Sequence, residues 1–445
     1  MARVGVLCYH GAGHLNPLIA LSRELVTRGH HVIFYLPGEL ESHIRQQGLD
    51  FFPIDLAEIR QTNDGVESTS NSEKESTEDT RVRLRRLDKE IGVYVREYLA
   101  AIEVTKVDAL LMGEITFAGP TVAEISNTPY FVVSTSIPHN FGWQASEALQ
   151  PHRTRQDRLQ ARIFEVSIFR MKGPVSHILD RHRHNAGLGP TADIEADFPE
   201  LAHITQWPQC LDDVRNDAPE RFFYTGPFID RTTRPVVEFP WQELTKQPLV
   251  YASLGTTRKA DLEIYHRVAS ACAGLDMQVV LTLGGSQRSL ESLAKFPRNT
   301  IVVANAPQLD LLERADVVIT HAGPNTVLEA LLFGKPMLAL PLALDQPAVA
   351  TRLERLGVAE VLSPHVCSAD EIRKSLLKLQ TDNRYRRAAI AIQGQLRALR
   401  GVARAASIVE DAMANYRETS LPKGSRPLSP FDYSADASPS NAKRA

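Results

Sequence analysis

The sequence VVITHAGPNTVLE, residues 317–329, combines a short apolar run, a glycine-containing loop and a helical pattern. The apolar run is rich in β-branched residues and predicts a buried strand that ends at Thr320, with a helix beginning near Asn325. The first backbone N–H groups of such a helix have no intrahelical acceptor, and the positive end of the helix dipole lies beside them. The segment therefore predicts a strand–loop–helix unit that can bind a phosphate group.

Strands and helices alternate on both sides of this segment. Apolar runs that predict strands occur at residues 249–253, 279–283, 300–303, 317–320 and 337–340. Helical patterns separate them at residues 262–273, 308–314, 326–333 and 346–356. Such alternation predicts a parallel sheet covered by helices on both faces.

The first half of the chain begins in the same way. Residues 4–8 predict a strand, 10–17 a glycine-rich loop, 18–28 a helix and 31–36 the next strand. Further strands are expected at 109–112 and 130–134, and helices at 82–102, at 121–125 and over much of 144–185. The fold class is therefore α/β, with two Rossmann-like domains facing each other across a cleft.

The composition along the chain suggests domain boundaries. We expect one Rossmann-like domain over 1–225, a proline-rich linker over 226–246 and a second Rossmann-like domain over 247–384. A long helix over 385–416 is expected to pack back on the first domain, and a Ser- and Pro-rich tail over 417–445 is expected to be disordered.

The overall composition excludes several classes of protein. The chain has 445 residues, and a net charge of −3 gives no basic field for nucleic acid. Four scattered cysteines form no CxxC pair, so neither a zinc site nor a disulfide framework is indicated. No apolar run approaches the roughly 18 residues of a membrane span, and the N-terminus does not read as a signal peptide. We expect a cytoplasmic protein, and peripheral membrane contact is left open.

Several side chains near residues 317–329 suit a nucleotide sugar. His321 can donate to a phosphate oxygen, and Asn325 or Thr326 can cap the helix or donate to a phosphate. Glu329 lies four residues beyond Asn325 on the same helical face and can accept from ribose hydroxyls. The pair Asp345 and Gln346, after another strand, offers an acceptor and an amide for sugar hydroxyls. Each residue alone could be a helix cap, a solvated glutamate or a core histidine, but their joint spacing favours a binding site.

The motifs APQ, HAGPNTVLE, FGKP and PLALDQP stand in order between residues 306 and 347. They resemble the donor signature of the UDP-glycosyltransferase superfamily, which implies the GT-B fold. The resemblance implies that His321, Asn325, Thr326 and Thr256 bind the phosphates, Glu329 the ribose, Gln308 the base, and Asp345 with Gln346 the sugar. Ala306 and Gly323 complete this implied donor set. The resemblance also implies that the domain over 247–384 binds the nucleotide sugar and that the domain over 1–225 binds the acceptor. Many members have a tryptophan that stacks on uracil where this chain has Asn305, so the base is left open between uracil and thymine.

The segment GAGHLNP, residues 11–17, is the candidate catalytic element. Histidine suits the removal of a hydroxyl proton because its unperturbed pKa is about 6.5. The segment resembles the GHxNP element of the same superfamily, which implies that His14 is the general base. Family members place an aspartate after a later strand to orient the base. Here Glu114 is the nearby acid, and a loop glutamate that faces water is an equal alternative.

The expected reaction follows from these residues. No D-x-D motif occurs, so we expect no metal and no cofactor besides a UDP-sugar co-substrate. We expect inversion at the anomeric carbon, glucose as the sugar, and a small lipophilic or aromatic acceptor. Phrases such as PLVYASLGT and VLTLGG resemble bacterial transferases related to zeaxanthin glucosyltransferase. A non-hydrolysing nucleotide-sugar epimerase and a catalytically silent partner protein are the alternatives.

Overall fold

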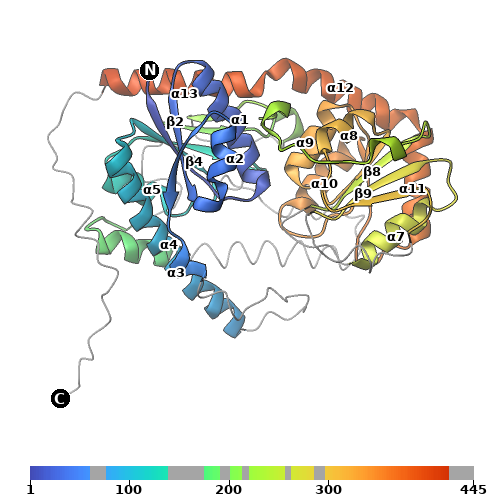
Figure 1. Ribbon diagram of the computed structural model, residues 1–445, viewed down its shortest axis with the longest axis horizontal. Helices are drawn as coiled ribbons and strands as arrows, with labels where there is room; N and C mark the ends of the chain where they lie inside the picture. The colour runs from blue at the N-terminus through green and yellow to red at the C-terminus, as the bar shows by residue number, and fades with distance from the viewer. Residues whose placement is uncertain are drawn as a thin grey trace.

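The computed structural model describes residues 1–60, 77–138, 175–190, 201–212, 220–255, 262–284 and 296–419. The described chain forms two α/β lobes side by side, with the long C-terminal helices running across both (Figure 1). The described residues do not include Thr256, most of the helical region expected at 144–185, or the end of the tail at 420–445. They also omit most of segment 61–80, whose Ser, Thr, Asn and acidic residues predict a surface loop.

The first lobe contains a seven-stranded parallel sheet in the order β3-β2-β1-β4-β5-β6-β7. Its strands are β1 Arg3–Leu7, β2 His31–Pro37, β3 Asp50–Ile54, β4 Ala109–Gly113, β5 Tyr130–Ser134, β6 Ala202–Thr205 and β7 Phe222–Tyr224. The inner strands β4 and β6 are buried along their whole length because helices cover both faces. The strand order reverses direction beside β1, which makes the gap between β1 and β4 a topological switch point.

The second lobe contains a six-stranded sheet in the order β10-β9-β8-β11-β12-β13. Its strands are β8 Leu249–Ser253, β9 Gln278–Thr282, β10 Thr300–Val303, β11 Val317–Thr320, β12 Met337–Ala339 and β13 Ala359–Val361. Every pair is parallel, as the alternation of strands and helices predicts. The corresponding switch point lies between β8 and β11, so both lobes have the doubly wound Rossmann arrangement.

Helices cover the sheets. Those of the first lobe are α1 Ala12–Thr27, α2 Glu41–Gln46, α3 Ala57–Arg60, α4 Thr77–Thr105 and α5 Gly119–Ile125, and residues 175–185 are also helical. Those of the second lobe are α7 Leu262–Cys272, α8 Gln308–Arg314, α9 Pro324–Leu332, α10 Gln346–Arg355 and α11 Ala369–Thr381. Short 3-10 turns occur at Gly38–Leu40, Gln209–Leu211, Arg231–Thr233 and Trp241–Glu243.

The expectation of a loop over residues 10–17 is wrong. Helix α1 begins at Ala12, so His14 lies in its first turn. Gly11 and Gly13 suggested a loop, but the helix begins between them and continues through Pro17. Its missing N–H removes only one helical hydrogen bond, the one to Gly13.

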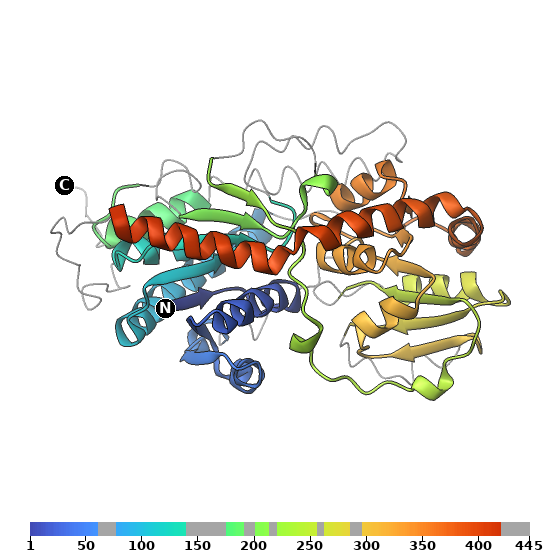
Figure 2. The same cartoon turned by 90° about the horizontal axis from the view of Figure 1, so that it is seen from above.

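The C-terminal segment forms two helices, where the sequence suggested one over 385–416. Helix α12 Asn383–Leu399 contributes Ala389, Ile392 and Leu396 to the core of the second lobe. Helix α13 Gly401–Thr419 crosses to the first lobe and packs on α1 (Figure 2). The break falls at Arg400, whose φ of 49° is left-handed and ends a helix.

The chain crosses between the lobes at two places that touch each other. One crossing is the segment after β7, and the other is the break between α12 and α13. Gly226 has a φ of +100°, and a Cβ there would lie 2.9 Å from Cβ of Leu399. A Cβ on Gly401 would clash with the backbone of Gly226. Both positions therefore require glycine, because the two backbones approach too closely for a side chain. Among the described helices, none is long and apolar enough to cross a membrane.

Candidate active site

The two switch points carry the candidate residues of the two lobes. His14 follows β1, and Glu114 follows the neighbouring strand β4. His321 follows β11, and Gly255 follows the neighbouring strand β8. Ligands of open α/β sheets bind outside the carboxyl ends of the strands at such points. His14 and Glu114 in the first lobe and His321 in the second therefore lie at the sheet edges where this fold binds ligands.

The His321 ring is packed between two glycines. A Cβ on Gly255 would lie 2.7 Å from Nε2 of His321, and a Cβ on Gly323 would clash with the same atom. Ala322, between His321 and Gly323 in the sequence, has a left-handed φ of 63°, which is uncommon for a residue other than glycine. Burial lowers the pKa of His321 to about 4, and a hydrogen bond with the Ser253 backbone opposes part of that effect. The imidazole is therefore neutral near pH 7 and acts as a hydrogen-bonding group rather than as a cation.

The start of α9 is the predicted phosphate site. Gly323 is the N-cap and Pro324 is the first helical residue, so the next free N–H groups belong to Asn325 and Thr326. The Asn325 side chain, however, extends to the first lobe. Its Nδ2 donates to the Gly13 carbonyl at 2.8 Å, and its Oδ1 accepts from Gln206 Nε2 at 2.9 Å. This side chain therefore joins the two lobes beside His14.

Glu329 lies at the centre of a polar cluster within the second lobe. It is 1% exposed, and its two oxygens accept from Arg234 and from Gln308. Gln308 in turn accepts from the Tyr251 hydroxyl at 3.0 Å. Residues predicted to bind ribose and base are thus adjacent. Arg234 belongs to the linker, and no motif in the sequence indicated it.

The predicted sugar-binding pair opens α10. Asp345 is the N-cap of that helix and is partly exposed. Gln346 is buried, and its Oε1 accepts from the backbone N–H groups of Leu342 and Ala343 at 2.8 and 2.9 Å. Leu344 has a left-handed φ of 59°, so the loop before α10 is strained. Ala306 is partly buried and precedes α8. The side-chain carbonyl of Gln346 therefore stabilises this loop. Only the amide N–H groups of the same side chain are left to contact a sugar.

The contacts of the candidate base include a hydroxyl. Nδ1 of His14 lies 2.7 Å from Oγ1 of Thr135, a residue that is 2% exposed and directly follows β5. Glu114 is partly buried, and its backbone N–H donates to Val133 at 3.1 Å. Its predicted role beside His14 stays a prediction. Sequence reasoning missed Thr135 and Gln206, although both come immediately after a strand at the sheet edge where ligands bind.

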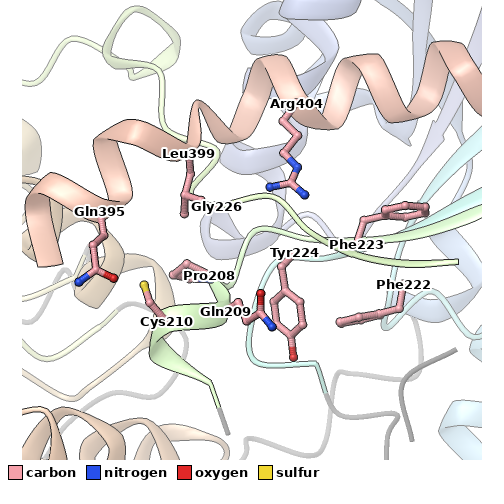
Figure 3. Close-up of a pocket in the computed structure, with 10 residues that line it drawn as sticks. All are labelled: Pro208, Gln209, Cys210, Phe222, Phe223, Tyr224, Gly226, Gln395, Leu399 and Arg404. Atoms are coloured by element: carbon pink, nitrogen blue, oxygen red, sulfur yellow. The ribbon is translucent and has the colours of Figure 1, made fainter. Parts of the chain in front are cut away.

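A separate pocket of about 410 Å³ lies under the junction of α12 and α13 (Figure 3). Phe222, Tyr224, Cys210 and Arg404 are among the residues that line it. It contains none of the predicted donor or catalytic residues, so it is distinct from the candidate site. Within the described ranges, no three His, Cys, Asp or Glu residues are grouped closely enough to hold a metal ion.

Comparisons with known proteins agree with this arrangement. Residues 266–400 match the family model described as erythromycin biosynthesis protein CIII-like, C-terminal domain. Zeaxanthin glucosyltransferase of Pseudescherichia vulneris is 31% identical over 92% of this chain and 97% of that protein. Demethyllactenocin mycarosyltransferase of Streptomyces fradiae is 24% identical over 93% of this chain and 87% of that protein.

Solved structures share the fold. The glycosyltransferase of kitacinnamycin superposes with a TM-score of 0.72 at 24% identity, over 92% of this chain and 98% of that one. A spinosyn rhamnosyltransferase complexed with thymidine diphosphate gives 0.63 at 18% identity, over 92% and 100%. The fold is therefore GT-B. With this architecture and a relative at 31% identity over nearly its whole length, the chain belongs to the UDP-glycosyltransferase family and is a glycosyltransferase of the macrolide and zeaxanthin type.

Proposed function

We propose that this glycosyltransferase transfers a sugar from a nucleoside diphosphate to a hydroxyl group of a small lipophilic or aromatic acceptor, with inversion and without a metal ion. The observation that supports this most is the meeting of the two lobes at the candidate residues. The side chain of Asn325, at the start of α9, bonds to Gly13, the residue before His14. This contact supports the proposal that the base and the leaving-group site lie next to each other on opposite lobes.

His14 is the proposed general base. Its Nδ1 is held by Thr135, and we assign the proton transfer to Nε2. The acceptor oxygen loses its proton to Nε2 and attacks the anomeric carbon. The bond from that carbon to the phosphate oxygen breaks, and the nucleoside diphosphate leaves. A single in-line displacement of this kind converts an α-linked donor to a β-glycoside.

The leaving phosphate is proposed to be stabilised by neutral donors. The His321 imidazole and the N–H groups of Asn325 and Thr326 lie at one edge of the second sheet. A helix N-terminus stabilises developing negative charge without a metal. Among the described residues, no three His, Cys, Asp or Glu side chains are grouped so as to hold a metal ion, and the sequence contains no D-x-D motif. We therefore propose that the enzyme acts without a metal.

The donor is proposed to be a UDP- or dTDP-sugar, with UDP-glucose as the first to test. Glu329 and Gln308 are the proposed ribose and base ligands, and the hydrogen bond between their side chains supports a shared site. Asn305 is exposed and cannot stack on a base as tryptophan does. One relative is a zeaxanthin glucosyltransferase, whereas a spinosyn rhamnosyltransferase with the same fold binds thymidine diphosphate, so both nucleotides are to be compared. Carotenoid, polyketide and phenolic hydroxyls are the acceptor classes to compare.

The test combines a donor panel with product stereochemistry. The protein is incubated with UDP- and dTDP-glucose and each acceptor class, and the anomeric proton of the product is examined by NMR. We expect a β-glycoside from an α-linked donor. An α-glycoside would contradict single displacement. A new nucleotide sugar formed without any acceptor would favour an epimerase, and a complete lack of product with bound donor would favour a silent partner.

A further inference from the structure

A proline in α1 exposes a backbone acceptor beside the proposed base. In a regular helix the N–H of residue 17 would donate to the carbonyl of residue 13. Pro17 has no N–H, so the Gly13 carbonyl lacks that partner. Asn325 Nδ2 donates to it at 2.8 Å instead. Gly13 also lets α9 approach, because a Cβ there would lie 3.3 Å from the same Nδ2 atom.

A buried glutamine holds the other side of this contact. Gln206 follows β6 and is 1% exposed. Its Nε2 donates to the Thr135 carbonyl at 2.5 Å and to Asn325 Oδ1 at 2.9 Å. Its Oε1 accepts from the Phe228 N–H, at the start of the linker, at 3.1 Å. One amide thus joins the first sheet, the donor helix and the linker.

These contacts form a closed circuit around the proposed reaction centre. Thr135 bonds to Nδ1 of His14 through its hydroxyl and to Gln206 through its carbonyl. Gln206 bonds to Asn325, and Asn325 bonds back to the residue before His14. We infer that Gln206 is a positioning residue that sets the donor helix α9 at a fixed distance from His14, and that the Asn325 side chain serves this interlobe tie rather than phosphate binding.

The contact between Gln206 and Asn325 is expected to affect the rate of transfer more than the affinity for the donor. This inference rests on the proposed role of His14. In-line attack requires the reacting atoms to be about 3–3.5 Å apart, and a misplacement of about 1 Å can lower the rate a hundredfold. Nucleotide binding depends on groups within the second lobe, such as Glu329 and the backbone at the start of α9. Loss of the tie should therefore lower kcat and leave nucleotide affinity nearly unchanged.

The first test replaces Gln206 by leucine, beside a matched control. Gln278 is also buried, and its amide bonds to Thr245 and Glu243 far from the candidate site. Both Gln206→Leu and Gln278→Leu remove buried hydrogen bonds and should lower Tm. We expect only Gln206→Leu to lower kcat, by about tenfold to a hundredfold. Its Kd for UDP or dTDP, measured by calorimetry, should change less than about threefold.

Asn325→Ala keeps the inference testable if Gln206→Leu does not fold. A role in phosphate binding predicts weaker binding of UDP or dTDP with kcat preserved at saturating donor. The interlobe tie predicts the reverse, a lower kcat with the same nucleotide Kd. In the Asn325→Ala background, Gln206→Leu should cost little further activity, because the shared contact is already lost.

The outcomes separate the two proposals. A normal kcat in Gln206→Leu, or a loss of nucleotide affinity without loss of kcat in Asn325→Ala, would overturn the inference while the proposed function stands. Lack of transfer by the wild-type protein with every donor and acceptor would overturn the proposed function, and the inference with it.

Discussion

His321 should make the second lobe sensitive to acid. Burial lowers its pKa from 6.5 to about 4. The folded state therefore favours the neutral imidazole, whereas the unfolded chain takes up a proton near pH 6.5. Each unit of pKa difference corresponds to about 1.4 kcal/mol. The free energy of unfolding is therefore about 3 kcal/mol higher when His321 is neutral than when it is protonated. That stability is present above pH 6.5 and falls as the pH drops toward 4, with about 2 kcal/mol lost by pH 5.

The assay compares wild type with His321→Gln, which cannot titrate in this range. Hydrogen exchange of the β11 amides at pH 7.5 and pH 5 reports the opening free energy of the second lobe. Other titrating groups are common to both proteins and cancel in the difference. The wild type should lose about 2 kcal/mol more than the variant between these pH values. His365→Gln is the control, because His365 is exposed in the same lobe. Parallel losses in wild type and His321→Gln would refute the reasoning.

Three further predictions use other parts of the molecule. Transfer should continue in EDTA, since phosphate stabilisation is assigned to neutral donors, and activity that is lost and then restored by magnesium would contradict this. Glu114→Gln should slow turnover and move the acid limb of the pH–rate profile to lower pH, because a carboxylate stabilises a protonated His14; an unchanged profile would make Glu114 an ordinary loop residue. Arg352→Ala should lower the free energy of unfolding by about 3 kcal/mol in urea titrations, because it breaks the buried ion pair between Arg352 and the Asp212 carboxylate, whose atoms lie 3.3 Å apart. A change below about 0.5 kcal/mol would show that this pair contributes little.

The sequence alone predicted the two-domain α/β architecture, because local patterns of apolar residues determine the strands and helices. The runs at residues 249–253 and 317–320 form β8 and β11 within the expected bounds. Alternating strands and helices then leave few topologies for a parallel sheet. The start of α1 was less predictable, because residues 10–17 contain two glycines and a proline and resemble a loop. Pro17 lies inside the helix without ending it, which only tertiary packing could reveal.

The candidate site was predictable only in part. The helix α9 signature placed His321, Asn325 and Glu329 near one another, because they share one strand–loop–helix unit. The partners of these residues come from distant segments. Gln206 and Arg234 reach α9 from the first lobe and the linker, across 119 and 95 residues of sequence. No short motif encodes such contacts, since they depend on how the lobes meet. The Asn325 side chain therefore has interlobe contacts that its motif did not suggest.

The turnover of the His14→Ala variant tests the proposed mechanism most directly. The rate of transfer at saturating donor and acceptor is measured beside the Kd for UDP and dTDP, with His10→Ala, an exposed histidine in the same segment, as the control. If His14 is the general base, kcat should fall by about a hundredfold or more, while nucleotide affinity and the control stay close to wild type. Near-normal turnover of His14→Ala with its true acceptor would contradict the assignment of His14 as the general base.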